Sequence, residues 1–348
     1  MKHARLIRST LVGIAALLAF AGCGKSQRAE KQTADEVFSI EREAPGKRAF
    51  LVVNAPGKWS VYAGASVGKI DMTTPLLEGA QTGRVELPLK NADHAFFRVK
   101  STLGETVLAE RHLPMAGGYN FRDLGGYKTA DGKRVRWGRV FRTDDLNKLT
   151  TEDLAYLASV PITSIVDFRS ESEIKAAPDL PAPSVRHQYA YSITPGNLTS
   201  ADDLNKFTKK QTEEFMIEMN RLFVTDERII GQYRKFFKLL QDEGKLPLMF
   251  HCSAGKDRTG MGAALFLASL GVDEKTIFED YMLSNRYLAG KYEPLVKKNP
   301  QLEPLYRVSP EFLRAGFEQM KKDHGSVENY LRKVLQVDLE KMRRLHLD

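Results

Sequence analysis

The sequence has few cysteines, only Cys23 and Cys252 in 348 residues. If Cys23 carries a modification, Cys252 has no partner for a structural disulfide, even in an oxidising compartment. A lone cysteine is most often a buried, unreactive side chain, and this is one interpretation of Cys252. Its neighbours in the sequence, described below, favour a reactive thiol instead.

Blocks of lysine and arginine interleaved with aromatic residues are also missing, which excludes the usual pattern of a nucleic-acid-binding protein. The formal net charge is +8, and it is +5 without residues 1–22, which hold three basic and no acidic residues. The remaining excess of positive charge is small and scattered along the sequence, so we expect a solvated surface and no nucleic-acid partner. The seven histidines form no ligand cluster, and we expect neither a metal nor a cofactor.

A membrane-spanning helix needs about 20 apolar residues, and the N-terminal run is shorter than that. Leu11–Ala21 is apolar, basic residues precede it, and small residues lead from it into Cys23. This layout is typical of a secretory signal peptide, here residues 1–22. The residues before Cys23 resemble a bacterial lipobox, in which the cysteine is lipidated. We therefore expect an exported lipoprotein, anchored through Cys23 to the bacterial cell envelope, at the outer membrane or the periplasmic face in a Gram-negative host; cleaved secretion or an uncleaved anchor is the alternative.

Residues 23–35 are polar and lack an apolar period, which predicts a tether. Short β-type runs fill residues 36–114, and we predict a small all-β sandwich there, similar to fibronectin type III. No residue of this region identifies a partner, and we expect a spacer or docking surface rather than a catalytic role. The expected strands are Phe50–Val53, Trp59–Ala63, Val85–Leu89, Ala95–Val99 and Thr106–Glu110.

In residues 115–348 strands precede helices around a central strand–loop–helix unit, which predicts an α/β domain with a central sheet flanked by helices. Ile162–Phe168 reads as a buried strand with Asp167 and Arg169 at its end. The carboxyl ends of strands in open α/β sheets face the ligand crevice. Both residues are therefore candidate site residues, with a helix cap or an ion pair as the alternative.

The rest of this domain is predicted to be mainly helical. Ala201–Val224 is charged and amphipathic, a surface helix or, as the less favoured alternative, a lid; Pro181–Ser200 is expected to be a loop. The other expected helices are Thr150–Leu157, Glu227–Gln241, Lys275–Leu288, Pro310–Lys322, Val327–Leu335 and Leu339–Leu345.

The central unit places a thiol and a guanidinium at opposite ends of one short loop. The apolar run Leu246–Phe250 predicts a strand, and the Ala-rich segment Met261–Leu270 predicts a helix that ends at Gly271. Five residues separate Cys252 from Arg258. A turn this short can surround one small anion.

Successive backbone N–H groups of such a loop converge on one point, and the positive end of the following helix adds to them. Arg258 supplies a planar pair of donors that matches two phosphate oxygens. The same surroundings stabilise a thiolate and lower a cysteine pKa from about 8.5 into a range of about 3.5–7.5. Ser253, Ala254 and Gly255 are small enough to leave room for a dianion. The residues thus indicate phosphate as the ligand and Cys252 as the nucleophile.

The segment His251-Cys-Ser-Ala-Gly-Lys-Asp-Arg-Thr-Gly260 resembles the signature loop of cysteine-dependent tyrosine phosphatases. Its Gly-Lys-Asp-Arg-Thr variant is similar to that of bacterial tyrosine and dual-specificity phosphatases that also act on phosphoinositides. The resemblance covers residues 116–345 and leaves the predicted β-sandwich outside. Four further blocks are similar to companion motifs of that bacterial family: Asn120–Tyr127, Asp167–Ser170, Tyr281–Asn285 and Gly325–Leu331.

The resemblance implies a two-step hydrolysis, in which Cys252 attacks to give a phosphocysteine and water then hydrolyses it. Arg258 and the backbone donors are implied to hold the charge of the transition state. Thr259 is implied to donate to the sulfur as it leaves, and His251 to orient Cys252 from behind.

The general acid departs from the usual pattern of tyrosine phosphatases. Many of them use a Trp-Pro-Asp loop, which is missing here because the two tryptophans are Trp59 and Trp137. Asp257, inside the loop, and Asp167, at a strand end, are the candidate acids, with Asp257 ahead.

Lys256 bears on the substrate, because a lysine at this place helps to hold additional phosphates in lipid-phosphatase relatives. A solvated loop cation is the alternative. We expect a phosphomonoester hydrolase that acts on phosphotyrosine, with dual specificity left open, and a phosphoinositide or inositol-polyphosphate phosphatase as the alternative enzyme. A non-catalytic surface lipoprotein, in which the phosphatase fold is only a scaffold for binding, is the alternative of another class.

Overall fold

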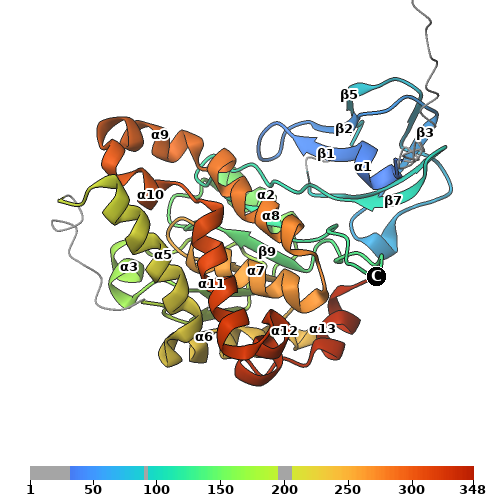
Figure 1. Cartoon of the computed structure of the whole chain (residues 1–348). Helices are drawn as coiled ribbons and strands as arrows, with labels where there is room; N and C mark the ends of the chain where they lie inside the picture. Colours follow the sequence, from blue (N-terminus) through green and yellow to red (C-terminus); the bar gives the residue numbers. More distant parts are fainter. Residues whose placement is uncertain (1–31, 90–92, 195–205) are drawn as a thin grey trace, which may run out of the picture. The chain divides into compact units, whose positions relative to one another are not determined.

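The computed structural model describes residues 32–89, 93–194 and 206–348, and Thr33–Asp348 form one compact unit (Figure 1). The predicted signal peptide and residues 23–31 of the predicted tether, Cys23 included, lie outside the described residues. Among the described helices, none combines the length and the apolar character that crossing a membrane requires.

Two antiparallel sheets make up the N-terminal part, with strand orders β1-β2-β5 and β4-β3-β6-β7. Their buried side chains, such as Leu51 of one sheet and Val99 of the other, pack into one apolar core. The strands are β1 Phe38–Arg42, β2 Ala49–Val53, β3 Trp59–Gly64, β4 Leu77–Gly79, β5 Gly83–Glu86, β6 Phe96–Ser101 and β7 Gly104–Leu108.

The predicted all-β N-terminal part is confirmed, and each predicted strand overlaps an observed one. The sequence analysis missed β1, although Phe38 and Ile40 alternate with exposed residues there, and β4, which is too short for a periodic signal. The likeness to fibronectin type III and the domain boundary near Pro114 stay predictions.

A five-stranded sheet of order β11-β10-β12-β9-β8 forms the centre of the second part. Its first four strands are parallel, and β8 pairs with β9 in the antiparallel sense. The strands are β8 Arg122–Asp123, β9 Val140–Thr143, β10 Ser164–Asp167, β11 His187–Ala190 and β12 Leu248–His251. The central strand β12 ends level with its neighbours, because His251 pairs in register with Asp167 and with Thr143.

Apolar cores cover both faces of this sheet. Along β12, Leu248 and Phe250 belong to the larger core and Met249 to the smaller one, as the twofold period of a strand requires. The larger core contains α7, Arg258–Leu270, and the smaller contains α2, Thr151–Ser159. The predicted α/β domain with helices on both sides of a central sheet is confirmed.

Each predicted helix overlaps an observed one, but four of the described α-helices were not predicted: Ala34–Val37, Glu171–Ala176, Ala289–Lys298 and Glu303–Tyr306. Thr150 caps α2, and Gly271, with a φ of +83°, ends α7 as predicted. The other helices are α1 Ala34–Val37, α3 Glu171–Ala176, α5 Lys209–Thr225, α6 Glu227–Leu240, α8 Glu274–Tyr287, α9 Ala289–Lys298, α10 Glu303–Tyr306, α11 Pro310–His324, α12 Val327–Asn329 and α13 Leu339–His346.

The predicted loop Pro181–Ser200 and the predicted helix Ala201–Val224 need separate comment. The predicted loop Pro181–Ser200 contains the edge strand β11, whose sequence His-Gln-Tyr-Ala has too little apolar character to signal a strand. Within Ala201–Val224 the described helix is α5, which packs along α11 and buries Met216 and Phe223, as a surface helix does. Residues 201–205 lie outside the described ranges.

Candidate active site

The loop between β12 and α7 is held by contacts to its carbonyl oxygens. The Asn120 amide donates to the carbonyls of Ala254 and Gly255 at 3.1 Å each, and Arg142 Nη2 donates to Gly255 O at 2.7 Å. Each trans peptide directs its N–H group opposite to its carbonyl, so these N–H groups turn toward the inside of the loop. Gly255 has a φ of +64°, and a Cβ there would lie 2.2 Å from Thr143 O, so only glycine fits.

Cys252 is a free thiol at the start of this loop and is only 2% exposed. Burial raises its pKa, but the Arg258 guanidinium and the hydroxyl and N–H of Thr259 outweigh burial, and the pKa of Cys252 lies below its ordinary value. Thr259 Oγ1 has no other hydrogen-bond partner among the described residues, which leaves it free to donate to Sγ.

Arg258, the first residue of α7, is held by a carboxylate that the sequence analysis did not identify. Its Nη1 and Nη2 each donate to one oxygen of Glu173 at 2.8 Å, and Ser253 Oγ donates to the same carboxylate at 2.5 Å. Burial lowers the pKa of Arg258, but Glu173 and the Cys252 thiolate outweigh it and raise the pKa. The end-on pairing fixes the plane of the guanidinium.

Glu173 lies in the first turn of α3. Its carboxylate accepts a bond from Ser170 N at 2.8 Å, and its own N–H donates to Ser170 Oγ at 3.2 Å, which together form a capping box. Burial raises the pKa of Glu173, but the contacts to Arg258 outweigh it and hold the pKa well below its usual range. The Ser-x-x-Glu pattern could have predicted the helix start, whereas the contact to Arg258 depends on how α3 packs.

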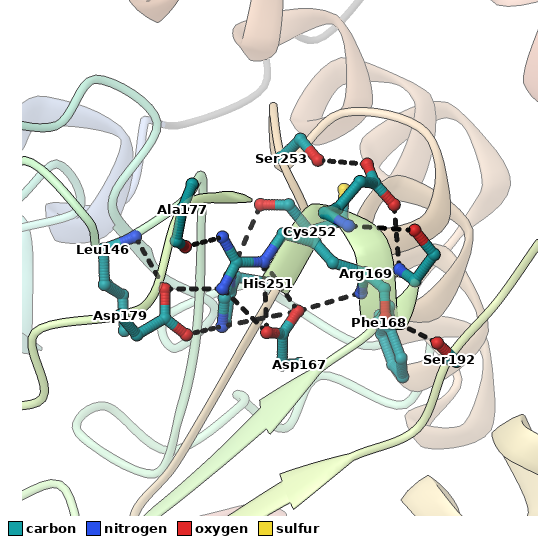
Figure 2. Close-up of polar contacts among 12 residues, drawn as sticks. Leu146, Asp167, Phe168, Arg169, Ala177, Asp179, Ser192, His251, Cys252 and Ser253 are labelled. Carbon is teal, nitrogen blue, oxygen red and sulfur yellow. Dashed lines mark hydrogen bonds and ion pairs between the residues drawn. The ribbon is translucent and has the colours of Figure 1, made fainter. Parts of the chain in front are cut away.

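Behind the loop, Asp167 and Arg169 form a buried ion pair (Figure 2). Arg169 Nε lies 3.0 Å from both oxygens of Asp167, and its Nη2 lies 2.8 Å from one of them. Asp167 does not line the pocket beside Arg258. The ion-pair alternative therefore describes these two residues, and the predicted acid role of Asp167 has no support in its position, because Asp167 lies outside the lining of the pocket next to Arg258.

Asp179 and His251 complete this buried network. Arg169 Nη2 lies 2.8 Å from Asp179 Oδ1, which also accepts from Leu146 N, and His251 Nε2 lies 3.0 Å from Asp179 Oδ2. Asp167, Asp179 and His251 bring their ligand atoms as close together as a metal site does, but Arg169 already contacts both carboxylates as their cation. Asp179 follows a proline in a loop, and the sequence gives no local signal for its contact to His251.

Asp257 lines a pocket of about 360 Å³ next to Arg258. Lys256 Nζ lies 2.7 and 2.9 Å from the two oxygens of Asp257, and Lys256 is only 2% exposed. Lys256 is thus neither a solvated cation nor free to meet a second phosphate in this arrangement. Ile193, Met219 and Phe223 form an apolar side of the same pocket.

A second buried network next to the loop joins the companion motif Asn120–Tyr127 to Asp280, which directly precedes the motif Tyr281–Asn285. Arg122 Nε lies 3.3 Å and Arg142 Nη1 lies 2.6 Å from the carboxylate of Asp280, to which Tyr127 also donates at 2.8 Å. Burial raises the pKa of Asp280, but the two arginines outweigh it and keep the pKa well below its usual range. Because Arg142 also binds Gly255 O, this network fixes the loop to the sheet.

The structure brings nearly all predicted site residues together, and Cys23 alone lies outside the described residues. Asp167 lies behind the loop. Lys291 of α9, which was not predicted, reaches the loop with its Nζ 3.4 Å from Ser253 O. The predicted residues within the loop or at its ends are His251, Cys252, Ser253, Ala254, Gly255, Lys256, Asp257, Arg258 and Thr259. Their catalytic roles stay predictions.

Comparison with known proteins agrees with the geometry of the loop. The sequence is 34% identical over 241 residues to a predicted tyrosine-protein phosphatase of Cupriavidus necator, which covers 66% of this chain and 85% of that protein. It is 28% identical over 279 residues to the triple specificity protein phosphatase PtpB of Mycobacterium tuberculosis, which covers 68% of this chain and 98% of that protein.

Solved structures resemble the chain only distantly. The catalytic core of the PP-IP phosphatase SIW14 of S. cerevisiae is 14% identical, with a TM-score of 0.28 over 54% of this chain and 97% of that one. TpbA of P. aeruginosa, in complex with pTyr, is 12% identical, with a TM-score of 0.25 over 61% and 88%. The family model that describes the tyrosine phosphatase family matches residues 113–348, well over half of the sequence. The chain belongs to the tyrosine phosphatase family.

Proposed function

We propose that this enzyme hydrolyses phosphotyrosine through a phosphocysteine on Cys252. The observation that carries the proposal is a free thiol with a pKa below its ordinary value, in a short loop that ends at Arg258, whose charge lowers that pKa. The Cys252 thiolate attacks phosphorus, and the bond to the leaving oxygen breaks. Water then attacks the phosphocysteine, the S–P bond breaks, and phosphate and thiolate are released. Thr259 donates to the departing sulfur, and Arg258 stabilises the transferring group.

Asp257 is the proposed general acid for the leaving oxygen. It faces the pocket beside Arg258, so a leaving group protonated by Asp257 lies in that pocket. Lys256 holds the carboxylate through both oxygens and fixes its direction. The leaving group then lies against the apolar side of the pocket.

The lining of this pocket favours an aromatic leaving group. Met219 and Phe223 offer apolar contacts to a phenyl ring, and Arg258 is the only cation among the described residues that line the pocket. An inositol polyphosphate would place further phosphates near Asp257 and Glu173, where the described cations Lys256 and Arg258 already pair with these two carboxylates. We therefore rank phosphotyrosine above inositol phosphates as the substrate.

A wider substrate range is supported by one relative, PtpB, which is named for triple specificity. The direct comparison is kcat/KM on a phosphotyrosine peptide, the matching phosphoserine peptide and a phosphoinositide in mixed micelles. We expect the phosphotyrosine peptide to give the highest value. A higher value on the phosphoinositide would replace this proposal with the alternative enzyme.

The basic test of catalysis is phosphate release from a phosphotyrosine peptide by the wild type and by Cys252→Ser. We expect turnover by the wild type and none above background by the variant, because the serine hydroxyl is a far weaker nucleophile than a thiolate at neutral pH. If the folded wild type releases no phosphate from any of the three substrates, the protein is a non-catalytic scaffold instead.

The acid assignment is tested with two aryl phosphates whose leaving phenols differ in acidity. Asp257→Asn is expected to lower kcat by about 10²–10⁴-fold for phosphotyrosine, a poor leaving group, and by much less for p-nitrophenyl phosphate, whose leaving group needs little protonation. An equal loss on both substrates would show that Asp257 supports the loop rather than donating the proton.

We also propose that the mature enzyme is a lipoprotein, exported and anchored by Cys23 to the cell envelope. The support is the order of basic, apolar and small residues before Cys23. Metabolic labelling with a radioactive fatty acid is expected to mark the wild type and not Cys23→Ser. A labelled Cys23→Ser, or an unlabelled wild type that is exported, would rule the anchor out.

A further inference from the structure

Asp179 and His251 make a contact behind Cys252 that the proposed mechanism does not use. His251 is fully buried, and both of its ring nitrogens face oxygen acceptors. Nδ1 lies 3.4 Å from the Cys252 carbonyl, and Nε2 lies 3.0 Å from Asp179 Oδ2 (Figure 2). A neutral imidazole has only one N–H, so it would set a lone pair against one of these oxygens. The imidazolium has an N–H for each.

The charged groups around His251 also favour its positive form. Asp179 and Asp167 face Nε2, the latter at 3.8 Å, and Arg169 is the one cation beside them among the described residues. Two carboxylates and one guanidinium leave a buried negative charge, which an imidazolium cancels. Burial lowers the pKa of His251, but the two carboxylates outweigh it and raise the pKa above its ordinary value. The Nε2 contact is an ion pair rather than an aligned hydrogen bond.

We propose that Asp179 is a positioning residue for the nucleophile: it keeps His251 as an imidazolium, and the imidazolium stabilises the Cys252 thiolate. His251 directly precedes Cys252, and its Nδ1 lies 3.4 Å from the Cys252 carbonyl, whereas Asp179 contacts the other ring nitrogen, Nε2. The positive partner of the pair is therefore the one nearer to Cys252. At unequal distances the nearer charge dominates. Arg258 and Thr259 stabilise the thiolate from the other side.

The test is the pKa of the Cys252 thiol, measured from thiolate absorbance at 240 nm in full-length protein with Cys23→Ser, so that Cys252 is the only cysteine. Asp179→Asn removes a negative charge. If His251 kept its proton, that removal would lower the pKa of Cys252. We expect the opposite, a rise of about 0.5–1 pH unit, because His251 becomes neutral. An unchanged or lower thiol pKa would overturn the proposal.

Two comparisons separate this effect from general damage. Asp323→Asn, an exposed substitution of the same kind on α11, is expected to leave the thiol pKa unchanged. His251→Gln is expected to raise it more than Asp179→Asn does, because it removes the imidazolium and leaves the negative charge of Asp179. The double variant is expected to match Asp179→Asn, in which the imidazolium is already lost. If the shifts of the thiol pKa in the two single variants added up in the double variant, Asp179 would not act through His251.

The inference rests on the proposed function only for its effect on turnover. The acid limb of kcat/KM on a phosphotyrosine peptide should move upward with the thiol pKa in Asp179→Asn. The thiol titration needs no substrate, so it decides the inference even if the wild type proves inactive.

The wild type alone offers a further check if Asp179→Asn does not fold. With ring-labelled histidine and His251→Gln to assign the resonance, NMR is expected to show His251 as an imidazolium at pH 7.5. A neutral ring at that pH would overturn the proposal.

Discussion

The two sides of Cys252 are built from the same kind of contact and differ in their access to water. In front, Arg258 pairs with Glu173, with 17% and 36% of their side chains exposed. Behind, Arg169 pairs with Asp167 and Asp179, and its side chain is 1% exposed. The front pair can share its arginine with an incoming phosphate, whereas the rear cluster has no room for another anion. We therefore propose that Arg258 serves catalysis and that Arg169 holds the loop in place.

Desolvation explains why the two clusters should respond differently to substitution. A buried charge that loses its partner cannot turn to water, so removing one member of a buried cluster is costly. A partly exposed charge recovers hydration, and its loss should appear in kinetics more than in stability. The predictions below use this contrast.

The largest effect is expected for Arg169→Met, which leaves Asp167 and Asp179 with His251 as their only nearby cation. We predict a loss of about 3–5 kcal/mol in the free energy of unfolding, measured by urea denaturation. Arg228→Met is the matched control, because Arg228 pairs with Asp226 two residues earlier, as Arg169 does with Asp167, but is exposed. Its expected cost is about 0–1 kcal/mol. Similar losses in both variants would remove the distinction between the buried and the exposed pair.

Arg258→Lys keeps the charge in front of Cys252 but removes the planar pair of donors. We predict a fall of about 10²–10³-fold in kcat, about 2.7–4 kcal/mol of transition-state stabilisation, with KM changed less. Steady-state kinetics on a phosphotyrosine peptide measure both. If Arg258→Lys had nearly the wild-type kcat, a positive charge would be enough for catalysis and the planar pair of donors would not be needed.

Glu173→Gln retains the shape of the side chain and its bond from Ser170 N but weakens its hold on Arg258. We predict about a tenfold lower kcat, near the low end of the cost of weakening a hydrogen bond to a charged group. Glu171→Gln, exposed on the same turn, serves as the control. A rise in kcat/KM for Glu173→Gln would mean that Glu173 competes with the substrate for Arg258 rather than orienting it.

The loop could be predicted from the sequence because its chemistry is local. Cys252, Arg258 and the small residues between them lie within a few positions of one another, and a strand and a helix on either side fix the turn. Its supports could not be predicted in the same way. Glu173 and Asp179 lie more than 70 residues before the loop, and their contacts exist only because α3 and the segment after it pack beside β12.

For Asp167 the sequence predicted the position of the residue but not the contacts of its carboxylate. The end of a strand was the right place to expect a site residue, since Asp167 pairs in register with His251. Which way its carboxylate turns depends on Arg169, two residues later, whose guanidinium occupies both oxygens. The sequence left the ion pair as an alternative and had no means to choose between it and an acid.

The most direct measurement is capture of the covalent intermediate. The wild type is mixed with a ³²P-labelled phosphotyrosine peptide, quenched within milliseconds, and digested, and the labelled peptide is sequenced. A phosphocysteine mechanism predicts label on Cys252 and none in Cys252→Ser. Turnover by the wild type with label on another residue, or with label that persists in Cys252→Ser, would contradict it.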